Sequence, residues 1–500
     1  MTKNQSFLLF WLLIAFSIIL KIPVLGLPFT GHFASYQSLN AMMASMIGEA
    51  PAEIPGWIFP QTFLLQEGRA GLHLLYYPFA SLSAWLGNSV TGWGLDFWGR
   101  FQALLYMSLA AYFLWNTLRR TRGERIAVLS ATVFLFSPMG LIYGTSFQNE
   151  AFAVCTLTLS YFLLEISKRS ALGGLLFGLC VVSRLHFLLV FPAFVYLLAG
   201  QPSPKKRWMS LGSFSLAFLI PLCLWLALVV YGQNHWGHVE SSLLDQTGEG
   251  RLFHTMLGTL TYTLRLAKIL LFDFLNPLFF LFLILFFFKK RKTSTVTFFI
   301  LWLAGSVLAA LIVPKKVADH PFYLISALPA ASVLTGLVLE DLLQSKRGLL
   351  KFFIFSFFAL NLSLAIVAPI LYPSPTESLA IPRLGKKVQT LSSSHDRIIA
   401  SHGSACDLLY YSHRKGWTFD LMMEERKIEQ QKRLLSLQAK GYGKLIAWLE
   451  YLRSQGAKYL VLSDAAEFYL RRDFSSYVES RYRNIDQSGN ALIFDLTTYE

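Results

Sequence analysis

The chain has 500 residues, of which 54% are hydrophobic and only 15% are charged, and it carries a formal net charge of +15. Its mean hydropathy is +0.48. Soluble globular domains contain roughly 25% charged residues, so this composition excludes an ordinary soluble protein. Repeated apolar runs of about 17–25 residues instead predict an α-helical protein that crosses a membrane many times.

The apolar runs predict about eleven transmembrane helices. They lie near residues 6–25, 98–118, 126–144, 150–167, 171–183, 185–200, 208–231, 267–288, 296–313, 321–343 and 349–372. No small-residue cleavage site follows the first run, so we interpret it as a retained helix and not as a signal peptide. The runs 171–183 and 185–200 are too short for two full spans at about 1.5 Å per residue, which predicts short or broken helices around Arg184.

The positive charge is concentrated in short clusters between the apolar runs, for example at Arg119–Arg122 and at Lys289–Lys292. Short loops rich in Lys and Arg are typical of the cytoplasmic side of a membrane protein. We therefore attribute the charge to topology and expect no nucleic-acid partner. The pattern places the N-terminus in the cytoplasm, and an odd number of spans then places the C-terminal residues outside.

The first predicted helix is followed by a long outer loop, residues 26–97, that contains two groups of polar and aromatic residues. The groups consist of His32, Tyr36, Gln37 and Asn40, and of Arg69, Tyr76 and Tyr77. Polar side chains beside a bilayer usually line a cavity or a site, because lipid cannot satisfy them. The alternative is a solvated connector without a function. If residues 32–40 are helical, His32 and Tyr36 share one face of the helix.

Three further positions on the outer side carry candidate site residues. Glu150 lies in a very short loop before an apolar run, where it could act as an acid or base or simply favour a helix N-terminus. Arg184 lies between two short runs, where a ligand role and a snorkelling or packing role are both open. Lys315 and Lys316 lie outside against the charge pattern, which makes them candidate anion ligands unless they contact lipid headgroups.

The composition changes after Tyr372–Thr376, and residues 380–500 are polar and charged. Short β-like runs at Arg397–Ser401, Tyr459–Ser463 and Ala491–Leu496 alternate with a stretch at Leu421–Ser454 that reads as amphipathic helix. This alternation predicts a small α/β domain outside the cytoplasm, separate from a transmembrane domain over residues 1–375. No glycine-rich phosphate loop is present in it.

Five motifs occur in order along the chain. They are Gly31–Gln37 in the first outer loop, Ser137–Gly144 followed by Glu150, Asp319–Pro329 at a late helix start, and Tyr410–Trp417 and Gly456–Val461 in the C-terminal part. Together they resemble the GT-C glycosyltransferases, and more closely the bacterial family 39-type enzymes related to dolichyl-phosphate-mannose and aminoarabinose transferases. The resemblance covers nearly the whole chain and depends on the order and topology of the motifs.

The resemblance implies a GT-C-type polytopic protein of the bacterial plasma (inner) membrane, with the C-terminal domain outside. It implies an enzyme that moves a sugar from a polyprenyl-phosphate donor to a glycan, lipid or protein acceptor outside the cytoplasm, by a single displacement with inversion. A divalent metal is possible, but the four cysteines do not have metal-ligand spacing, and no metal ligand is predicted. The alternatives are a transporter or lipid flippase and a non-catalytic GT-C-like scaffold that binds lipid.

Many GT-C enzymes place an aspartate in the first outer loop as a base or metal ligand, whereas residues 32–40 of this chain contain no carboxylate. We therefore predict Glu150 or His32 as the catalytic group, ahead of Glu49, Glu53 and Glu67. The substrate-binding residues implied by the resemblance are Tyr36, Gln37, Tyr76, Tyr77, His320 and Tyr323. The implied ligands of the donor phosphate are Arg184, Lys315, Lys316 and Arg69.

The predicted topology can be tested with a reporter fused after Glu500. An alkaline phosphatase fusion should be active there, because the odd number of spans places this end outside the cytoplasm. Activity of a reporter that functions only in the cytoplasm would reverse the topology and move every proposed site residue to the other face of the membrane.

Overall fold

The computed structural model describes residues 1–29, 34–49, 56–66, 69–236, 268–288, 294–312, 317, 320–344, 348, 375–402, 406–419, 421 and 443–499. The chain divides into two compact units. The helical unit comprises Met1–Gly26, Leu74–His235 and Glu240–Leu371. The sheet unit comprises Leu27–His73, Trp236–Val239 and Tyr372–Glu500.

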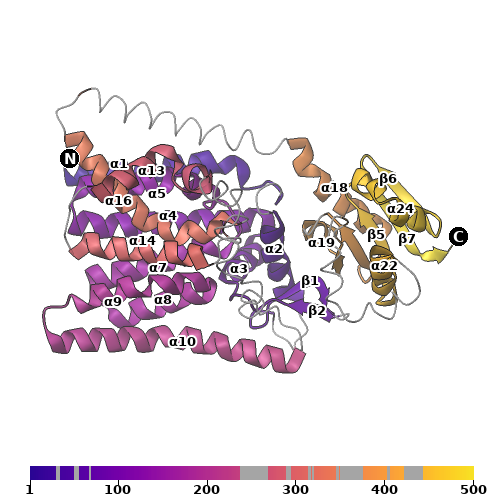
Figure 1. The fold of residues 1–500 in the computed structure, drawn as a ribbon, viewed down its shortest axis with the longest axis horizontal. Coiled ribbons are helices and arrows are strands. Elements are labelled where there is room, and N and C mark those ends of the chain that lie inside the picture. The colour runs from indigo at the N-terminus through magenta and orange to yellow at the C-terminus, as the bar shows by residue number, and fades with distance from the viewer. Residues whose placement is uncertain are drawn as a thin grey trace. The chain divides into compact units, whose positions relative to one another are not determined.

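The helical unit is built from helices that follow the predicted apolar runs, except for α3 (Phe79–Thr91), which falls in the predicted outer loop (Figure 1). Its longer helices are α1 (Lys3–Lys21), α3 (Phe79–Thr91), α4 (Leu95–Thr121), α5 (Glu124–Phe136), α7 (Asn149–Phe162), α8 (Ser170–Ser183), α9 (Phe191–Ala199), α10 (Pro204–Trp236), α13 (Asn276–Phe288), α14 (Ser294–Ile312) and α16 (Leu328–Gln344). Within the described parts of the chain, four stretches are long and apolar enough to cross a membrane: Lys3–Val24, Asn149–Ser167, Pro204–Gly232 and Pro321–Gln344. The predicted helical membrane-protein fold is confirmed, and the run 349–372 lies outside the described residues.

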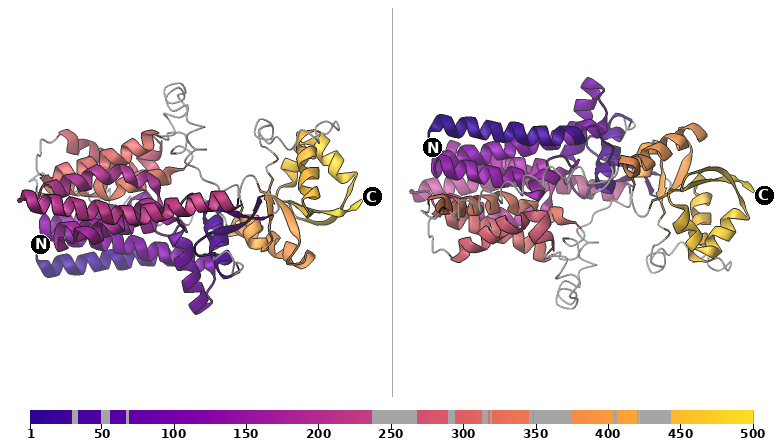
Figure 2. Two further views of the ribbon diagram at one scale, coloured as in Figure 1. Left: turned by 90° about the horizontal axis from the view of Figure 1, so that it is seen from below. Right: turned by 90° about the horizontal axis from the view of Figure 1, so that it is seen from above.

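The helices pack through large apolar side chains. Helix α4 contacts α5 and α7, and α5 also contacts α16. The fully buried Trp115 of α4 stacks on Phe10 of α1 with a centroid distance of 4.3 Å. In contrast, α10 runs along one side of this unit (Figures 1 and 2) and exposes Trp208, Leu216 and Leu224. Apolar side chains that are exposed along a long helix are expected where a protein faces lipid.

The predicted break near Arg184 is present. Helix α8 ends at Ser183, Arg184 has an extended backbone (φ −155°, ψ 103°), and the chain continues as the 3-10 turn η3 (Leu185–Val190) into α9. Comparable irregular turns precede other helices of this unit: α6 (Pro138–Ile142), the π turn η4 (Ile269–Phe274) and the 3-10 turn η5 (Pro321–Ala327), while the π turn η2 (Leu163–Ser167) ends α7. Irregular backbone inside a membrane-protein fold is tolerated where protein buries it or where it lines a cavity.

The sheet unit contains a seven-stranded sheet with the strand order β2-β1-β4-β3-β5-β7-β6. The strands are β1 (Gln61–Gln66), β2 (Arg69–Leu72), β3 (Arg397–Ser401), β4 (Gly416–Thr418), β5 (Ala457–Leu462), β6 (Tyr482–Ser488) and β7 (Ala491–Tyr499). Strands β3, β4 and β5 are parallel, and β7 pairs antiparallel with β5. The three predicted β-like runs coincide with β3, β5 and β7, so the predicted α/β character of the C-terminal part is confirmed.

The first outer loop contributes two strands and a helix to this sheet unit. The two strands were not predicted from the sequence. Strand β1 pairs with β2 as a hairpin and joins β4 in parallel, with Leu64 opposite Gly416. Helix α2 (Ala34–Glu49) contacts β1 and also α19 (Asp407–Ser412), which packs on α18 (Pro375–Leu391). The domain boundaries at residues 375 and 380 stay a prediction, to which the structure adds that Leu27–His73 groups with the C-terminal residues.

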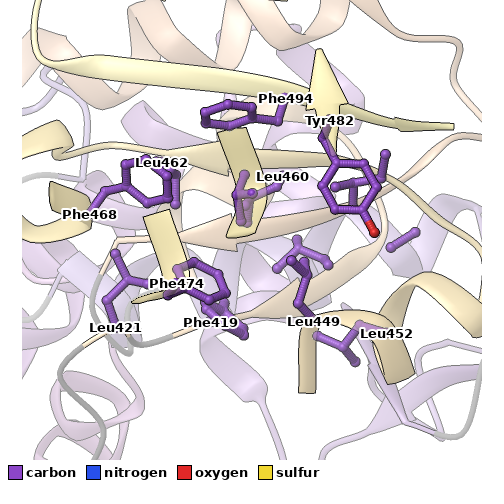
Figure 3. Close-up of a cluster of buried hydrophobic side chains, with 14 of the residues drawn as sticks. Phe419, Leu421, Leu449, Leu452, Leu460, Leu462, Phe468, Phe474, Tyr482 and Phe494 are labelled. Carbon is purple, nitrogen blue, oxygen red and sulfur yellow. The ribbon is translucent and has the colours of Figure 1, made fainter. Parts of the chain in front are cut away.

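One face of the sheet is covered by α22 (Lys444–Ser454), α23 (Ala465–Leu470) and α24 (Arg472–Glu479). Figure 3 shows the apolar side chains between these layers, among them Leu449 and Leu452 from α22, Phe468, Phe474, and Leu460 from β5. These side chains are almost completely buried. Burying each large apolar side chain contributes about 1.5–3 kcal/mol, which accounts for a stable layer on this face.

Two glycines of the helical unit provide a test of its packing. A Cβ at Gly174 in α8 would lie 2.1 Å from the carbonyl oxygen of Phe214 in α10, whereas a Cβ at Gly212 would meet nothing within 4 Å. We expect Gly174→Ala to destabilise the protein by about 1–3 kcal/mol through overpacking. Gly212→Ala should be neutral or stabilising by roughly 0.5–1 kcal/mol, because alanine favours a helix. Equal apparent unfolding midpoints of the two variants in detergent would contradict the close approach of α8 and α10.

Candidate active site

The start of α7 places a carboxylate in the interior of the helical unit. The helix begins at Asn149 after Gln148, whose side chain makes no capping hydrogen bond, and Glu150 lies in the first turn with its side chain 0% exposed. Asn149 accepts a hydrogen bond from the Ala80 amide (2.9 Å) and donates one to the Tyr77 carbonyl (3.0 Å). The segment that carries Tyr76 and Tyr77 is therefore attached directly to the turn that carries Glu150.

Glu150 is paired with Arg184. The Arg184 Nε atom lies 2.6 Å from Glu150 Oε1, and the two side chains are 7% and 0% exposed. The two groups meet without the alignment of a hydrogen bond. Among the described residues, neither Glu150 oxygen has a hydrogen-bond partner, and the same holds for Arg184 Nε and Nη2. Buried polar groups in native proteins are nearly always hydrogen-bonded, so this pair has the open bonding capacity expected of a ligand site.

Aromatic rings surround the Arg184 guanidinium. Its central carbon lies 4.2 Å from the centroid of the Tyr76 ring and 5.3 Å from that of Phe322. The Tyr323 ring lies 5.1 Å from the ring of His186, whose Nε2 is buried and has no hydrogen-bond partner in the described part of the chain. Rings over a cation stabilise it by about 0.5–2 kcal/mol and exclude water. The break between α8 and η3 thus aims a cation into an aromatic cage.

The turns η3 and η5 bring further polar residues to the same place. His320 stacks on Phe322 with a centroid distance of 5.3 Å. Tyr143, which follows α6, lies within electrostatic range of Glu150, Arg184 and Asp273. The sequence analysis did not assign roles to Tyr143, His186 or Asp273. Asp273 could have been recognised, because it is a lone carboxylate in an apolar run and such residues are usually functional.

The predicted site residues fall into three groups. Those in the helical unit are Tyr76, Tyr77, His320 and Tyr323. The Tyr76 ring lies against Arg184, the Tyr77 carbonyl accepts a hydrogen bond from Asn149, His320 stacks on Phe322, and Tyr323 lies beside His186. Those in the sheet unit are Tyr36 and Gln37 of α2 and Arg69 of β2. Those that lie outside the described residues are His32, Lys315 and Lys316. The helix predicted for the first-loop motif is present from Ala34 onward.

No group of three or more His, Cys, Asp or Glu side chains that could hold a metal ion occurs in the described residues. Glu150 and Arg184 form a carboxylate–guanidinium pair, and a guanidinium is a ligand for carboxylate or phosphate and not for a metal. The donor set at this site therefore fits an anionic substrate and a hydroxyl group.

The burial of the pair predicts a stability effect. We expect Glu150→Gln to destabilise the protein by about 3–5 kcal/mol, because it leaves the Arg184 charge buried without a counter-ion. The double variant Glu150→Gln/Arg184→Gln should recover most of this loss. The matched control is Glu165→Gln in η2, whose carboxylate lies 3.9 Å from a Lys168 side chain that is 60% exposed and whose loss should cost less than about 1 kcal/mol.

These differences can be measured as apparent unfolding midpoints of the purified variants in detergent. A Glu150→Gln variant as stable as Glu165→Gln would show that Arg184 has another counter-ion and would contradict the paired site.

Comparisons with known proteins agree with this architecture. Residues 77–225, which include Glu150 and Arg184, match the family model of dolichyl-phosphate-mannose-protein mannosyltransferase. The crystal structure of ArnT from Cupriavidus metallidurans bound to undecaprenyl phosphate matches with a TM-score of 0.64 and 11% identity over 97% of both chains. The apo state of the same ArnT matches with a TM-score of 0.63 and 10% identity over 99% of this chain and 98% of that chain.

An oligosaccharyltransferase from Archaeoglobus fulgidus in its apo form is also similar, with a TM-score of 0.54 and 12% identity over 97% of this chain and 73% of that chain. A search of curated protein sequences finds no match. At identities of 10–12%, these structural matches show a common fold and nothing beyond it. The chain therefore has the fold of the GT-C glycosyltransferases, and the resemblance to this superfamily that its sequence motifs predict is confirmed.

Proposed function

We propose that the protein is a membrane glycosyltransferase that moves a sugar from a polyprenyl-phosphate donor to an acceptor hydroxyl outside the cytoplasm. The observation that carries the proposal is the buried Glu150–Arg184 pair with its open hydrogen-bonding capacity, within the segment that matches the mannosyltransferase family. The similar ArnT structure holds undecaprenyl phosphate, which supports a polyprenyl-phosphate partner for this chain. We place the protein in the plasma membrane of a bacterium.

The chemistry of the pair fits this reaction. Arg184 presents a fixed fork of donors that can bind a phosphate in a bidentate manner, and its Nη2 makes no hydrogen bond to the residues that the structure describes. A donor phosphate that binds Arg184 would compete with Glu150 for the guanidinium. Glu150 would then be released from its counter-ion while the leaving group gains one. Donor binding and activation of the base are coupled in this way.

The transfer itself is a single displacement. The acceptor hydroxyl gives its proton to a Glu150 oxygen while its own oxygen forms the new bond to the anomeric carbon. The bond from that carbon to the donor phosphate oxygen breaks, and the configuration inverts. Arg184 stabilises the negative charge that develops on the phosphate, an interaction that is strong in a site closed to water. His32 remains the other proposed catalytic group.

The aromatic residues and amides have proposed binding roles. Tyr76 and Tyr323 contact or lie close to Arg184 and are placed to bind the sugar next to the phosphate. Tyr77 and His320 extend the same group of side chains. Lys315 and Lys316 are proposed as further ligands of the phosphate, with Arg69. Tyr36 and Gln37 are proposed to bind substrate from α2.

An assay in detergent tests the proposal, because a flippase or a lipid-binding scaffold leaves its lipid chemically unchanged. Purified protein is mixed with lipid extract from a deletion strain, in which the donor should accumulate. Mass spectrometry should show the polyprenyl-phosphate sugar converted to polyprenyl phosphate. Glu150→Gln should lower the rate by about 10²–10⁴-fold, the usual contribution of a general base. Glu165→Gln should retain full activity, because its carboxylate is paired locally with Lys168.

The rates are compared per folded molecule, at a temperature well below the unfolding midpoint of Glu150→Gln. If wild-type protein leaves every lipid-linked sugar unchanged, the transferase proposal is wrong. If Glu150→Gln turns over normally, Glu150 serves only the folded state and the base is another group.

A further inference from the structure

A second cluster of reactive side chains lies in the sheet unit, at the carboxyl ends of two parallel strands. Strands β3 and β5 are neighbours, and Ser401 pairs with Leu462 at their ends. His402 directly follows β3, and Ser463 directly follows β5. The Ser463 amide donates a hydrogen bond to the Ser401 carbonyl (2.9 Å), which fixes the two strand ends together.

This position is the switch point of the sheet. After β3 the chain passes through α19 into β4, which lies on one side of β3. The next strand in the sequence, β5, lies on the other side of β3. In open α/β sheets, ligands bind in the crevice outside the carboxyl ends of the strands at such a point. The strand order therefore predicts a ligand site at this edge of the sheet, whichever side chains occupy it.

The side chains form a chain of three groups. The Ser463 hydroxyl lies 2.7 Å from His402 Nδ1, and His402 Nε2 lies 3.6 Å from Oδ2 of Asp407, the first residue of α19. Asp407 Oδ1 accepts a hydrogen bond from the Leu408 amide (2.9 Å). The Asp407 side chain is 3% exposed, whereas that of His402 is 38% exposed. The carboxylate is thus held inside, and the imidazole faces solvent.

Asp407 is a buried carboxyl group beside the His402 imidazole. Burial raises the pKa of the Asp407 carboxyl, and the adjacent His402 lowers that pKa again. Asp407 Oδ2 faces His402 Nε2 at 3.6 Å, which is longer than a hydrogen bond, and a carboxylate on this side of the ring favours the tautomer with its proton on Nε2. Nδ1 of His402 is then the acceptor, and the Ser463 hydroxyl is the donor.

We infer that Ser463, His402 and Asp407 form a serine-nucleophile site that reacts with acyl esters. A hydroxyl becomes nucleophilic when a base lies within hydrogen-bond reach and a third group orients the base. The three residues meet this condition on the sheet unit, whereas Glu150 and Arg184 belong to the helical unit. Ser463 also lies at a turn from a strand to the helix α23, the location of the nucleophile in α/β-hydrolases, although Val461 and Ala465 occupy the two positions where that motif has glycine.

The proposed reaction has two steps, acylation and deacylation of Ser463. Ser463 Oγ forms a bond to the ester carbonyl carbon, and its proton passes to His402 Nδ1. The ester C–O bond breaks, and the leaving oxygen takes that proton to become an alcohol. Water, or an acceptor hydroxyl, then attacks the acyl carbon and gives its proton to His402. The bond from this carbon to Ser463 Oγ breaks, Ser463 takes the proton back, and a carboxylic acid or a new ester is released. Asp407 keeps its charge throughout and stabilises the imidazolium. An O-acyl ester is the substrate class.

The test uses the full-length protein and a fluorophosphonate probe, which reacts with activated serines. After trypsin digestion, the peptide 459–471 contains Ser463 as its only serine, so the site of labelling is unambiguous. We expect stoichiometric labelling of this peptide, no labelling in Ser463→Ala, and labelling at least ~10-fold slower in His402→Gln and Asp407→Asn. Ser476→Ala, an exposed serine on α24, is the matched control and should label like the wild type.

A second measurement is the release of nitrophenol from p-nitrophenyl acetate, which should show a burst in the wild type and none in Ser463→Ala. Glu150→Gln should label normally at Ser463, so a failure of the transferase proposal leaves this result unaffected. If wild-type protein in its folded state shows no label on peptide 459–471, the inference is overturned. Labelling of Ser463 that is equally fast in His402→Gln would also overturn it, because the serine would then react without its base.

Discussion

The helical unit depends on one electrostatic constraint, a carboxylate and a guanidinium buried against each other at the start of α7. Removing either charge from water costs several kcal/mol, and only a partner at close range offsets this cost. Glu150 and Arg184 lie at 2.6 Å with almost no exposure. The surroundings explain how they stay there: Asn149 ties the Tyr76–Tyr77 segment to α7, and Tyr76 and Phe322 cover the guanidinium. Both groups retain hydrogen-bonding atoms without a partner in the part of the chain that the structure describes, and the proposed reaction uses this capacity.

Segments of irregular backbone position the side chains around the Glu150–Arg184 pair. Arg184 has extended dihedral angles between α8 and η3, and η5 carries Phe322 and Tyr323 before α16 begins. A continuous α-helix would direct successive side chains around its axis and would spread these groups over several faces. A break allows one residue to point along the bundle instead. The unpaired carbonyls and amides at such breaks are themselves polar, so breaks and polar side chains gather at the same place.

Many of the helices and three of the strands could be predicted from the sequence, because their signals are local in the chain. Long apolar runs and a clear composition change are local signals, and they located the helices, the break at Arg184 and the strands β3, β5 and β7. Glu150 and Arg184 were both predicted as site residues, but as a base and a phosphate ligand with separate roles. Their pairing could not be foreseen, because it depends on how α7 packs against α8. Tyr143 lies in the motif Ser137–Gly144, but no role was assigned to it, since a tyrosine near a membrane boundary is common.

The strands β1 and β2 were missed because their stability is not local. They are short, and β1 becomes part of a sheet only by pairing with Gly416, which lies far away in the sequence. Other parts of the first outer loop also depend on C-terminal residues. In α2, the Ser35 carbonyl accepts a hydrogen bond from the Cys406 thiol (3.2 Å). The Phe29 amide donates a hydrogen bond to the Tyr411 hydroxyl (2.5 Å). Contacts across such separations form late, because loop closure opposes them. The first outer loop therefore cannot complete its fold until the C-terminal residues are present. A substitution in its motif, at Tyr36 or Gln37, acts on a folded unit shared with those residues and not on an independent loop.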